Sequence, residues 1–188
     1  MTFAAYPSLV GRVVFVSGGA TGIGADIVRA FARNRSRVAF IDLQREAGAA
    51  LAGELAADGE APLYLEADVT DVPALQAAIA QAREKLGPIG VLVNNAANDQ
   101  RHAFAEVSVD YWDHSQNVNL RHHFFAAQAV HQQMRELGFG SIVNLSSIAW
   151  RAGAAEMPAY AAAKAGVVGL TRALARAFGP DNIRVNAI

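Results

Sequence analysis

Residues 12–34, "RVVFVSGGATGIGADIVRAFARN", carry the strongest fold signal in this chain. The segment opens with a continuous apolar run, which is typical of a strand buried on both faces of a sheet. It closes with a segment in which Ile23, Ile27 and Phe31 recur at the spacing of one helix face. A glycine-rich loop joins the two. The whole therefore predicts a strand–loop–helix unit of the kind that binds nucleotide phosphates.

The same alternation of apolar β-branched runs with Ala-rich amphipathic segments continues along the chain. It predicts strands at 12–17, 37–42, 62–69, 89–94, 140–147 and 183–188, and helices at 22–34, 45–59, 72–87, 108–137 and 158–178. Such alternation gives a parallel sheet covered by helices on both faces, with right-handed crossovers. We therefore expect an α/β fold, a doubly wound Rossmann-like parallel sheet, as a single domain over 1–188.

The composition fits a folded globular domain and argues against several other classes. The 188 residues are 53% hydrophobic and 18% charged, with a formal net charge of −1 and no Cys. A near-neutral charge argues against nucleic acid or an anionic membrane as a partner. The lack of Cys excludes disulfides and thiolate catalysis. The N-terminus lacks the pattern of a signal peptide, and no apolar run approaches the roughly 18 residues of a membrane span, so we expect a cytoplasmic protein.

Three glycines of the loop have different expected tasks. Gly18 permits a tight turn, Gly22 lets the backbone approach a pyrophosphate, and Gly24 lets the helix and strand pack closely. Glycines also serve plain turns, but here a predicted strand precedes the loop and a predicted helix follows it. The context therefore favours nucleotide binding.

Asp42, at the end of the second predicted strand, bears on the choice between NAD and NADP. A carboxylate there can accept hydrogen bonds from the adenosine ribose and repels a 2′-phosphate. Thr21 supplies no cation for that phosphate, so NAD is the expected cofactor, and nearby Arg45 keeps NADP as the alternative. Asp68 and Val69, in the "ADV" that ends the third predicted strand, are expected at the adenine. Asp68 could instead cap the next helix.

Tyr160 and Lys164 lie one turn apart in "AYAAAK", so their side chains share one face of a predicted helix. A nearby ammonium stabilises a phenolate, and such a Tyr can take a proton from an alcohol. The pair alone is a weak signal, because this spacing occurs by chance on many helices. Ser147 at the end of the fifth predicted strand strengthens it, since those strand ends line the ligand crevice. Asn119 is unusual inside a predicted helix.

Taken in order, these pieces resemble the short-chain dehydrogenase/reductase family. The matching segments are "SGGATGIG", "ADV", "NNAA", "NVNL", "GSIVNLSS", "YAAAK" and "IRVNA", which span nearly the whole chain. The resemblance implies a catalytic tetrad of Asn119, Ser147, Tyr160 and Lys164. It also implies a cofactor site that contains Gly18, Thr21, Gly22, Ile23, Gly24, Asp42, Asp68, Val69, Asn95, Ala96, Tyr160 and Lys164.

The resemblance assigns a role to each member of the tetrad. Tyr160 is the expected acid/base, and Ser147 is expected to orient the substrate oxygen. Lys164 is expected to bind the nicotinamide ribose and to favour the phenolate. Asn119 is expected to hold a water that links Lys164 to solvent, and Asn94 to lie beside the cofactor.

The sequence departs from the family pattern in three places. Ala97 stands where the Asn–Asn–Ala–Gly motif has Gly, and Ser17 stands where the family has Thr, which keeps the hydroxyl. The family continues from "RVNA" into a Pro–Gly turn, a substrate-covering loop and a seventh strand, whereas this sequence ends at Ile188. We therefore expect a sheet truncated after its sixth strand, without the covering loop.

Within the family, "NNAANDQRHAFAEVSVDYWD" and "VNLRHHFFAAQAV" resemble bacterial aldose dehydrogenases, which oxidise the anomeric carbon to a lactone. A sugar requires many hydrogen bonds, which polar side chains after the fourth strand can supply. Trp150 can stack on the apolar face of a pyranose. The candidate substrate-binding residues are Asn98, Arg101, His102, Ser147 and Trp150. The alternative is that Asp99 and Arg101 pair with each other and only hold the loop.

Two other functions stay open: a reductase of 3-oxoacyl thioesters or another small ketone, and a nucleotide-binding protein without turnover. The histidines show no metal-ligand spacing, so we expect no metal. The helix at 158–178 is more apolar than one sheet face requires. This surplus, together with the resemblance, predicts a homo-oligomer, a dimer or a tetramer. The alternative is that the surplus packs in the core.

Overall fold

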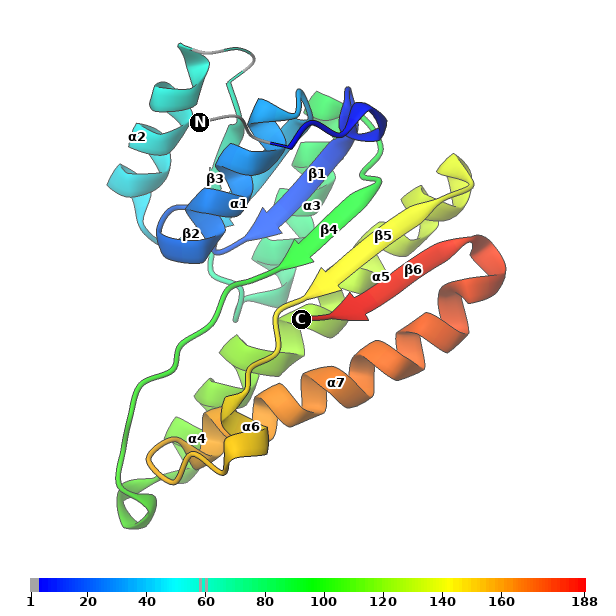
Figure 1. Ribbon diagram of the computed structural model, residues 1–188. Coiled ribbons are helices and arrows are strands. Elements are labelled where there is room, and N and C mark those ends of the chain that lie inside the picture. Colours follow the sequence, from blue (N-terminus) through cyan, green and yellow to red (C-terminus); the bar gives the residue numbers. More distant parts are fainter. Residues whose placement is uncertain (1–3, 58, 60) are drawn as a thin grey trace.

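The computed structural model describes residues 4–57, 59 and 61–188. Within these residues, six parallel strands form one sheet in the order β3-β2-β1-β4-β5-β6 (Figure 1). The strands are β1 (Val13–Ser17), β2 (Arg37–Asp42), β3 (Leu63–Glu66), β4 (Val91–Asn94), β5 (Gly140–Asn144) and β6 (Ile183–Ala187). The order reverses between β1 and β4. In open parallel sheets this switch point is where ligands bind.

Helices and short helical turns connect the strands. The helices are α1 (Gly22–Arg33), α2 (Arg45–Ala56), α3 (Val72–Leu86), α4 (Val109–Gln116), α5 (His122–Leu137), α6 (Ala149–Ala152) and α7 (Pro158–Phe178). The shorter turns are η1 (Pro7–Leu9), η2 (Phe104–Glu106), the π-helical η3 (Asn117–Arg121) and η4 (Gly179–Asp181). In the part of the chain that the structure describes, no helix is both long and apolar enough to span a bilayer.

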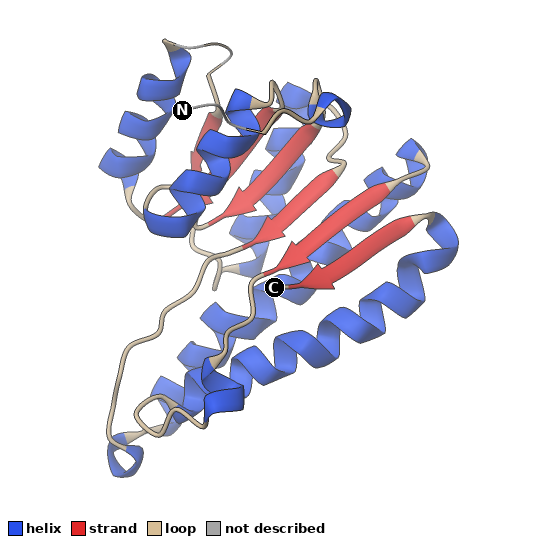
Figure 2. Ribbon diagram, in the orientation of Figure 1, coloured by secondary structure: helices blue, strands red, loops and turns tan. Residues whose placement is uncertain are grey.

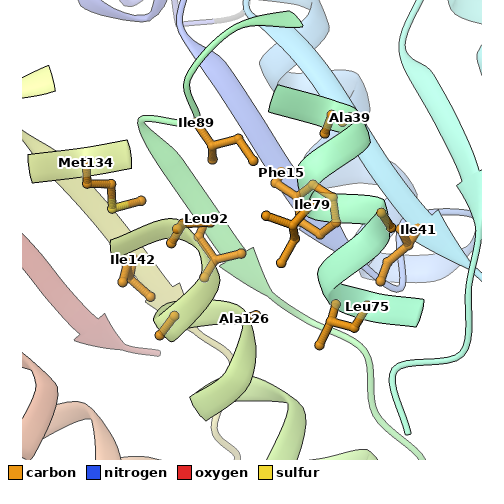
Figure 3. Packing of buried hydrophobic residues seen from close by; sticks show 14 of the residues in the cluster. Phe15, Ala39, Ile41, Leu75, Ile79, Ile89, Leu92, Ala126, Met134 and Ile142 are labelled. Atoms are coloured by element: carbon orange, nitrogen blue, oxygen red, sulfur yellow. The ribbon is translucent and has the colours of Figure 1, made fainter. Parts of the chain in front are cut away.

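The central strands are buried on both faces, as their continuous apolar runs predict (Figure 2). On one face, Phe15, Ile41 and Leu92 pack against side chains of α3 and α5 (Figure 3). On the other, Val16 and Phe40 pack against α1 and α2. The predicted doubly wound α/β sheet is confirmed.

Only one face of β6 is packed, among the residues that the structure describes. Burial alternates along this strand: Ile183 and Val185 are buried, while Arg184 and Asn186 are exposed. Helix α7 packs against β6 and shares a core with β5. The prediction of helices on both faces therefore applies to the central strands and not to this edge.

Several predicted boundaries are wrong. Strand β5 ends at Asn144 and β3 at Glu66, so Ser147 and "ADV" lie in the loops beyond their strands. The helix predicted over 45–59 ends at Ala56, and its residue 58 lies outside the described residues, as do residues 1–3 of the N-terminal segment. Both strands end where the inter-strand pairing ends, with Glu66 opposite Asp42 and Asn144 opposite Asn94.

The helix predicted over 108–137 consists of α4, the π-helical turn η3 and α5. The interruption falls on Asn119, whose side-chain Oδ1 accepts a hydrogen bond from the Asn98 amide at 2.9 Å and whose Nδ2 donates to the Asn98 carbonyl at 3.0 Å. Asn119 therefore joins the widened turn to the loop after β4. A π-turn inside a helix is common at functional sites.

Candidate active site

The glycine-rich loop is packed so tightly that a Cβ at any of three positions, Gly18, Gly19 or Gly24, would lie closer than 3 Å to a neighbouring atom. A Cβ at Gly18, whose φ is +68°, would lie 2.7 Å from the Ala96 Cα, and a Cβ at Gly24 would lie 1.8 Å from the Gly18 carbonyl oxygen. A Cβ at Gly22, whose φ is +55°, would meet no atom within 4 Å. A side chain is therefore excluded at Gly18, Gly19 and Gly24, whereas the space in front of α1 at Gly22 is open.

Asn95, which directly follows β4, is hydrogen-bonded to this loop. Its side-chain Nδ2 donates to the carbonyls of Ser17 at 3.2 Å and Gly18 at 2.7 Å. The backbone amides of Asn95 and Ala96 both donate to the Ser17 hydroxyl, at 3.1 and 3.2 Å. The ends of the two central strands are thus held together by side chains from both.

A cavity of about 680 Å³ opens at this switch point. It brings together all the predicted cofactor residues except Asn94, Tyr160 and Lys164. Asn98, expected near the substrate, and the adjacent Asp99 also line it. Sequence reasoning missed five further lining residues, although two of them directly follow Asp42 in the sequence: Leu43, Gln44, Ala67, His114 and Val118.

Asp42 and Asp68 face this cavity with partly engaged carboxylates. Asp42 accepts hydrogen bonds from the amides of Ala20 at 2.9 Å and Gln44 at 3.0 Å, and Asp68 accepts one from the Thr70 amide at 2.7 Å. The alternative that Asp68 caps the next helix is wrong, because Asp71 is the N-cap of α3. Both carboxylates keep lone pairs for a ligand.

The cavity fits a nicotinamide dinucleotide. Thr21, the N-cap of α1, makes no side-chain cap bond, and the first turn of α1 contains no acidic residue. The amides of that turn and the positive end of the helix dipole are therefore available to a phosphate. Asp42 lies at the end of β2, where a carboxylate can accept hydrogen bonds from ribose hydroxyls. Among the described residues, no group of three or more His, Asp or Glu side chains could hold a metal ion.

A second cavity of about 690 Å³ adjoins the first, because Ile23, Asn95 and Ala97 line both. It brings together Ser147 from the β5–α6 loop and two residues of α7, Tyr160 and Lys164. Trp150 of α6 also lines it and is 38% exposed. Four predicted site residues therefore meet where a substrate can lie beside the nicotinamide end of the cofactor.

Lys164 is almost fully buried, with 1% of its surface exposed. Its Nζ donates to the Leu145 carbonyl at 2.8 Å and lies 5.5 Å from the centre of the Tyr160 ring. Burial lowers the pKa of Lys164 to about 8, so the side chain is mainly cationic at neutral pH. The Ser147 hydroxyl accepts from the Ala149 amide at 3.1 Å, which leaves its proton free to donate.

Three of the predicted catalytic and substrate-binding residues lie apart from the walls of both cavities. Asn119 is fully buried and bonded to the Asn98 backbone, so its expected water-holding role stays a prediction. Arg101 pairs with Glu156 at 4.0 Å rather than with Asp99. The His102 amide donates to the Glu156 carbonyl at 2.8 Å. Arg101 and His102 thus join the loop after β4 to the loop before α7.

Beneath the cavities lies a buried polar layer. Asn94, expected beside the cofactor, is fully buried and donates to the Asn144 Oδ1 at 2.8 Å. His122 and His123 are also fully buried. Burial lowers the pKa of His122 to about 3 and the pKa of His123 well below its usual value, so both rings are neutral at physiological pH.

These two neutral rings predict acid sensitivity. A folded-state pKa below the unfolded value of about 6.5 means that the unfolded chain binds more protons at lower pH, so the free energy of unfolding falls as pH falls below about 6.5. For His122 alone the loss is about 2 kcal/mol at pH 5. Urea unfolding at pH 7 and pH 5 measures it, and His122→Phe is expected to reduce the difference. The same pH dependence in both proteins would contradict this assignment.

A parallel sheet with a dinucleotide-sized cavity beside a Ser–Tyr–Lys cavity defines a Rossmann-like, nucleotide-dependent oxidoreductase. Residues 12–188 match the family model of the short chain dehydrogenases. The chain belongs to this family, and it is an NAD(P)-dependent oxidoreductase.

Two relatives of similar sequence and one solved structure of the same fold can be compared with this chain. The chain is 53% identical over 184 residues to a probable galactose dehydrogenase from Rhizobium meliloti (strain 1021), a match that covers 97% of this chain and 72% of that protein. It is 45% identical over 188 residues to a D-xylose 1-dehydrogenase from Caulobacter vibrioides (strain NA1000 / CB15N), covering 100% and 74%. A blue fluorescent protein from a metagenomic library, solved in complex with NADPH, superimposes with a TM-score of 0.89 at 39% identity, covering 95% and 73%.

Proposed function

We propose that this chain oxidises an aldose at its anomeric carbon to a lactone, with NAD as the hydride acceptor. The observation that carries the proposal is the cavity in which Ser147, Tyr160 and Lys164 meet beside the nucleotide cavity. The two sugar dehydrogenases among the relatives support the choice of an aldose. Trp150 supports it further, because its partly exposed ring lines the cavity and can stack on a sugar.

The side chains divide the reaction between them. The Ser147 hydroxyl donates to the anomeric oxygen and holds it next to Tyr160. The Tyr160 phenolate takes the hydroxyl proton as the carbonyl forms. The bound nicotinamide supplies the hydride-accepting carbon. Lys164, whose Nζ lies 5.5 Å from the centre of the Tyr160 ring, supplies the positive charge next to the phenol.

The cofactor preference follows from charges at the end of β2. Asp42 faces the cavity with a carboxylate that repels a 2′-phosphate. Arg45, which could attract that phosphate, is paired with Glu66 at 2.5 Å. NADP is the competing cofactor, as in the NADPH-bound structural neighbour.

Asp42→Ala is expected to reverse this preference. It removes charge-assisted hydrogen bonds to the ribose, each of which contributes about 1.5–3 kcal/mol, and it removes the repulsion of the 2′-phosphate. The ratio of kcat/KM for NAD to that for NADP should fall at least about tenfold. The control is Asp26→Ala, which removes an exposed carboxylate of α1 outside the cavity. An unchanged ratio in Asp42→Ala would show that another group selects the cofactor.

The substrate proposal is tested by following NADH formation with a panel of pentoses, hexoses and deoxyhexoses, each with NAD and with NADP. We expect turnover with at least one aldose, with a lactone as the product detected by mass spectrometry. No signal on any aldose, together with reduction of a 3-oxoacyl thioester, would replace the proposal by the reductase alternative. NADH binding without turnover on either class would support a nucleotide-binding role.

We also propose that the protein is a cytoplasmic homo-oligomer, a dimer or a tetramer. Exposed apolar side chains near α4 and α5 support the assembly, since large exposed hydrophobics mark interaction surfaces: Phe104, Val109, Trp112 and Phe124. Light scattering coupled to size-exclusion chromatography measures the assembly. A monomer at micromolar concentration would contradict it.

A further inference from the structure

His122, at the start of α5, contacts the end of β1 and the turn η3, two segments next to the nucleotide cavity. The ring is fully buried. Its Nδ1 lies 2.7 Å from the Val118 carbonyl oxygen, and its Nε2 lies 3.3 Å from the Ser17 hydroxyl. Val118 belongs to the π-helical turn η3 and lines the nucleotide cavity. Ser17 is the last residue of β1 and directly precedes the glycine-rich loop.

Two independent constraints assign the protons of this group. A carbonyl oxygen can only accept, so Nδ1 of His122 carries the hydrogen that it shares with Val118. The Ser17 hydroxyl already accepts two amide hydrogens, from Asn95 and Ala96, which occupy both of its lone pairs. Its own proton therefore points to Nε2 of His122, which must be an unprotonated acceptor.

The neutral Nδ1–H tautomer satisfies both constraints at once. The protonated ring does not, because both nitrogens would then be donors and Nε2 would face a hydroxyl without a free lone pair. Burial also holds the ring neutral, as its low pKa shows. The arrangement is a chain of donors that runs from Asn95 and Ala96 through Ser17 to His122 and ends on Val118.

We infer that His122 is a positioning residue of the nucleotide cavity, which ties the ends of β1 and β4 and the turn η3 into one arrangement through its Nδ1–H tautomer. Each of the three segments contributes walls to the cavity: Gly18, Asn95, Ala96 and Val118. His122 itself is fully buried and does not line the cavity. It acts by orienting Ser17, which in turn fixes the amides of Asn95 and Ala96.

The neighbouring His123 offers a matched control. It is equally buried and lies on the same turn of α5. Its Nδ1 lies 3.3 Å from the Asn144 Oδ1, so its side-chain polar contact is with Asn144 in the buried polar layer and not with Ser17. Replacing His123 therefore disturbs the same region of the core without removing the connection to the glycine-rich loop.

The tautomer is tested directly on the unliganded full chain. Long-range ¹H–¹⁵N correlation spectra of the imidazoles, assigned through loss of the His122 signals in His122→Phe, report which nitrogen carries the proton. We expect Nδ1 protonated and Nε2 unprotonated from pH 6 to pH 8. A proton on Nε2 would overturn the inference, whatever the variants do.

The positioning role is tested by NADH affinity, measured by isothermal titration calorimetry. His122→Phe and Ser17→Ala are each expected to raise the Kd for NADH about tenfold, because each leaves one partner of a buried hydrogen bond unsatisfied. His123→Phe is expected to lower the melting temperature about as much as His122→Phe does. It should leave the Kd for NADH within about twofold of that of the unchanged protein.

A double-mutant cycle separates positioning from general loss of stability. If His122 acts through Ser17, the double variant should bind NADH about as weakly as either single variant. Effects on Kd that multiply, or a Kd for His122→Phe no higher than that for His123→Phe, would overturn the inference. The inference rests on the cofactor site and not on the sugar, so the aldose panel can fail without affecting it.

Discussion

Tyr160→Phe is expected to abolish measurable turnover while leaving NADH binding intact. The substitution removes the phenolic oxygen that we propose as the acceptor of the substrate proton, and it keeps the ring that lines the cavity. Loss of a general acid/base lowers kcat by about 10²- to 10⁴-fold. Steady-state kinetics with the best aldose from the panel measures kcat, and calorimetry measures the Kd for NADH, which should stay within about twofold.

Tyr111→Phe is the matched control for Tyr160→Phe. Tyr111 lies on α4, and its hydroxyl is 2.8 Å from the His102 Nδ1. Neither cavity is lined by Tyr111. We expect its kcat to remain near that of the unchanged protein. Turnover that survives in Tyr160→Phe would show that another group transfers the proton.

Gly24→Ala is expected to have the second largest effect, on stability and cofactor binding together. The added Cβ would lie 1.8 Å from the Gly18 carbonyl oxygen and 2.6 Å from the Asn95 Nδ2. Both neighbours are held by the hydrogen bonds between the loop and β4, so the loop must shift. Such overpacking costs about 1–3 kcal/mol or more, and about 1 kcal/mol corresponds to roughly 2–4 °C in melting temperature.

The shift of the loop also moves the amides at the start of α1, where we expect the phosphates to bind. NADH affinity should therefore fall by more than about tenfold. The control is Gly53→Ala in α2, where a Cβ meets no atom within 4 Å. It should stabilise the protein by about 0.5–1 kcal/mol, since Ala favours a helix over Gly. A melting temperature and NADH affinity for Gly24→Ala equal to those of the unchanged protein would contradict the packing argument.

Local patterns were sufficient to predict most of the sheet. The apolar runs that end at Ser17 and Asp42 are strands with those ends, because burial on both faces requires an unbroken run of apolar residues. The helix predicted over 158–178 has the same bounds in the structure, since Pro158 can begin a helix but not continue one. The hydrophobic pattern did not predict the π-helical turn that interrupts the helix near Asn119. It depends on a hydrogen bond to Asn98, which is close only in the folded chain.

The sequence predicted that Ser147, Tyr160 and Lys164 come together. The carboxyl ends of parallel strands and one face of a following helix meet at the same edge of the sheet. The resemblance supplied their roles. The sequence could not show that Arg101 pairs with Glu156, or that His102 is joined to the same segment. Those contacts connect two loops that are distant in the sequence, and no local sequence periodicity indicates which loops lie together in the folded chain.

His122 shows the difference between what local sequence patterns predict and what only tertiary contacts decide. In the sequence it is one of five histidines without metal-ligand spacing, and nothing local distinguishes it. In the folded chain it lies between Ser17 and Val118, and its proton is placed by their hydrogen-bonding requirements. Periodicity and glycine spacing thus specified the strands, the helices and the nucleotide loop, because these follow from short-range sterics and burial. The polar contacts under the cavity arise only when distant segments pack, since a buried donor must then find an acceptor.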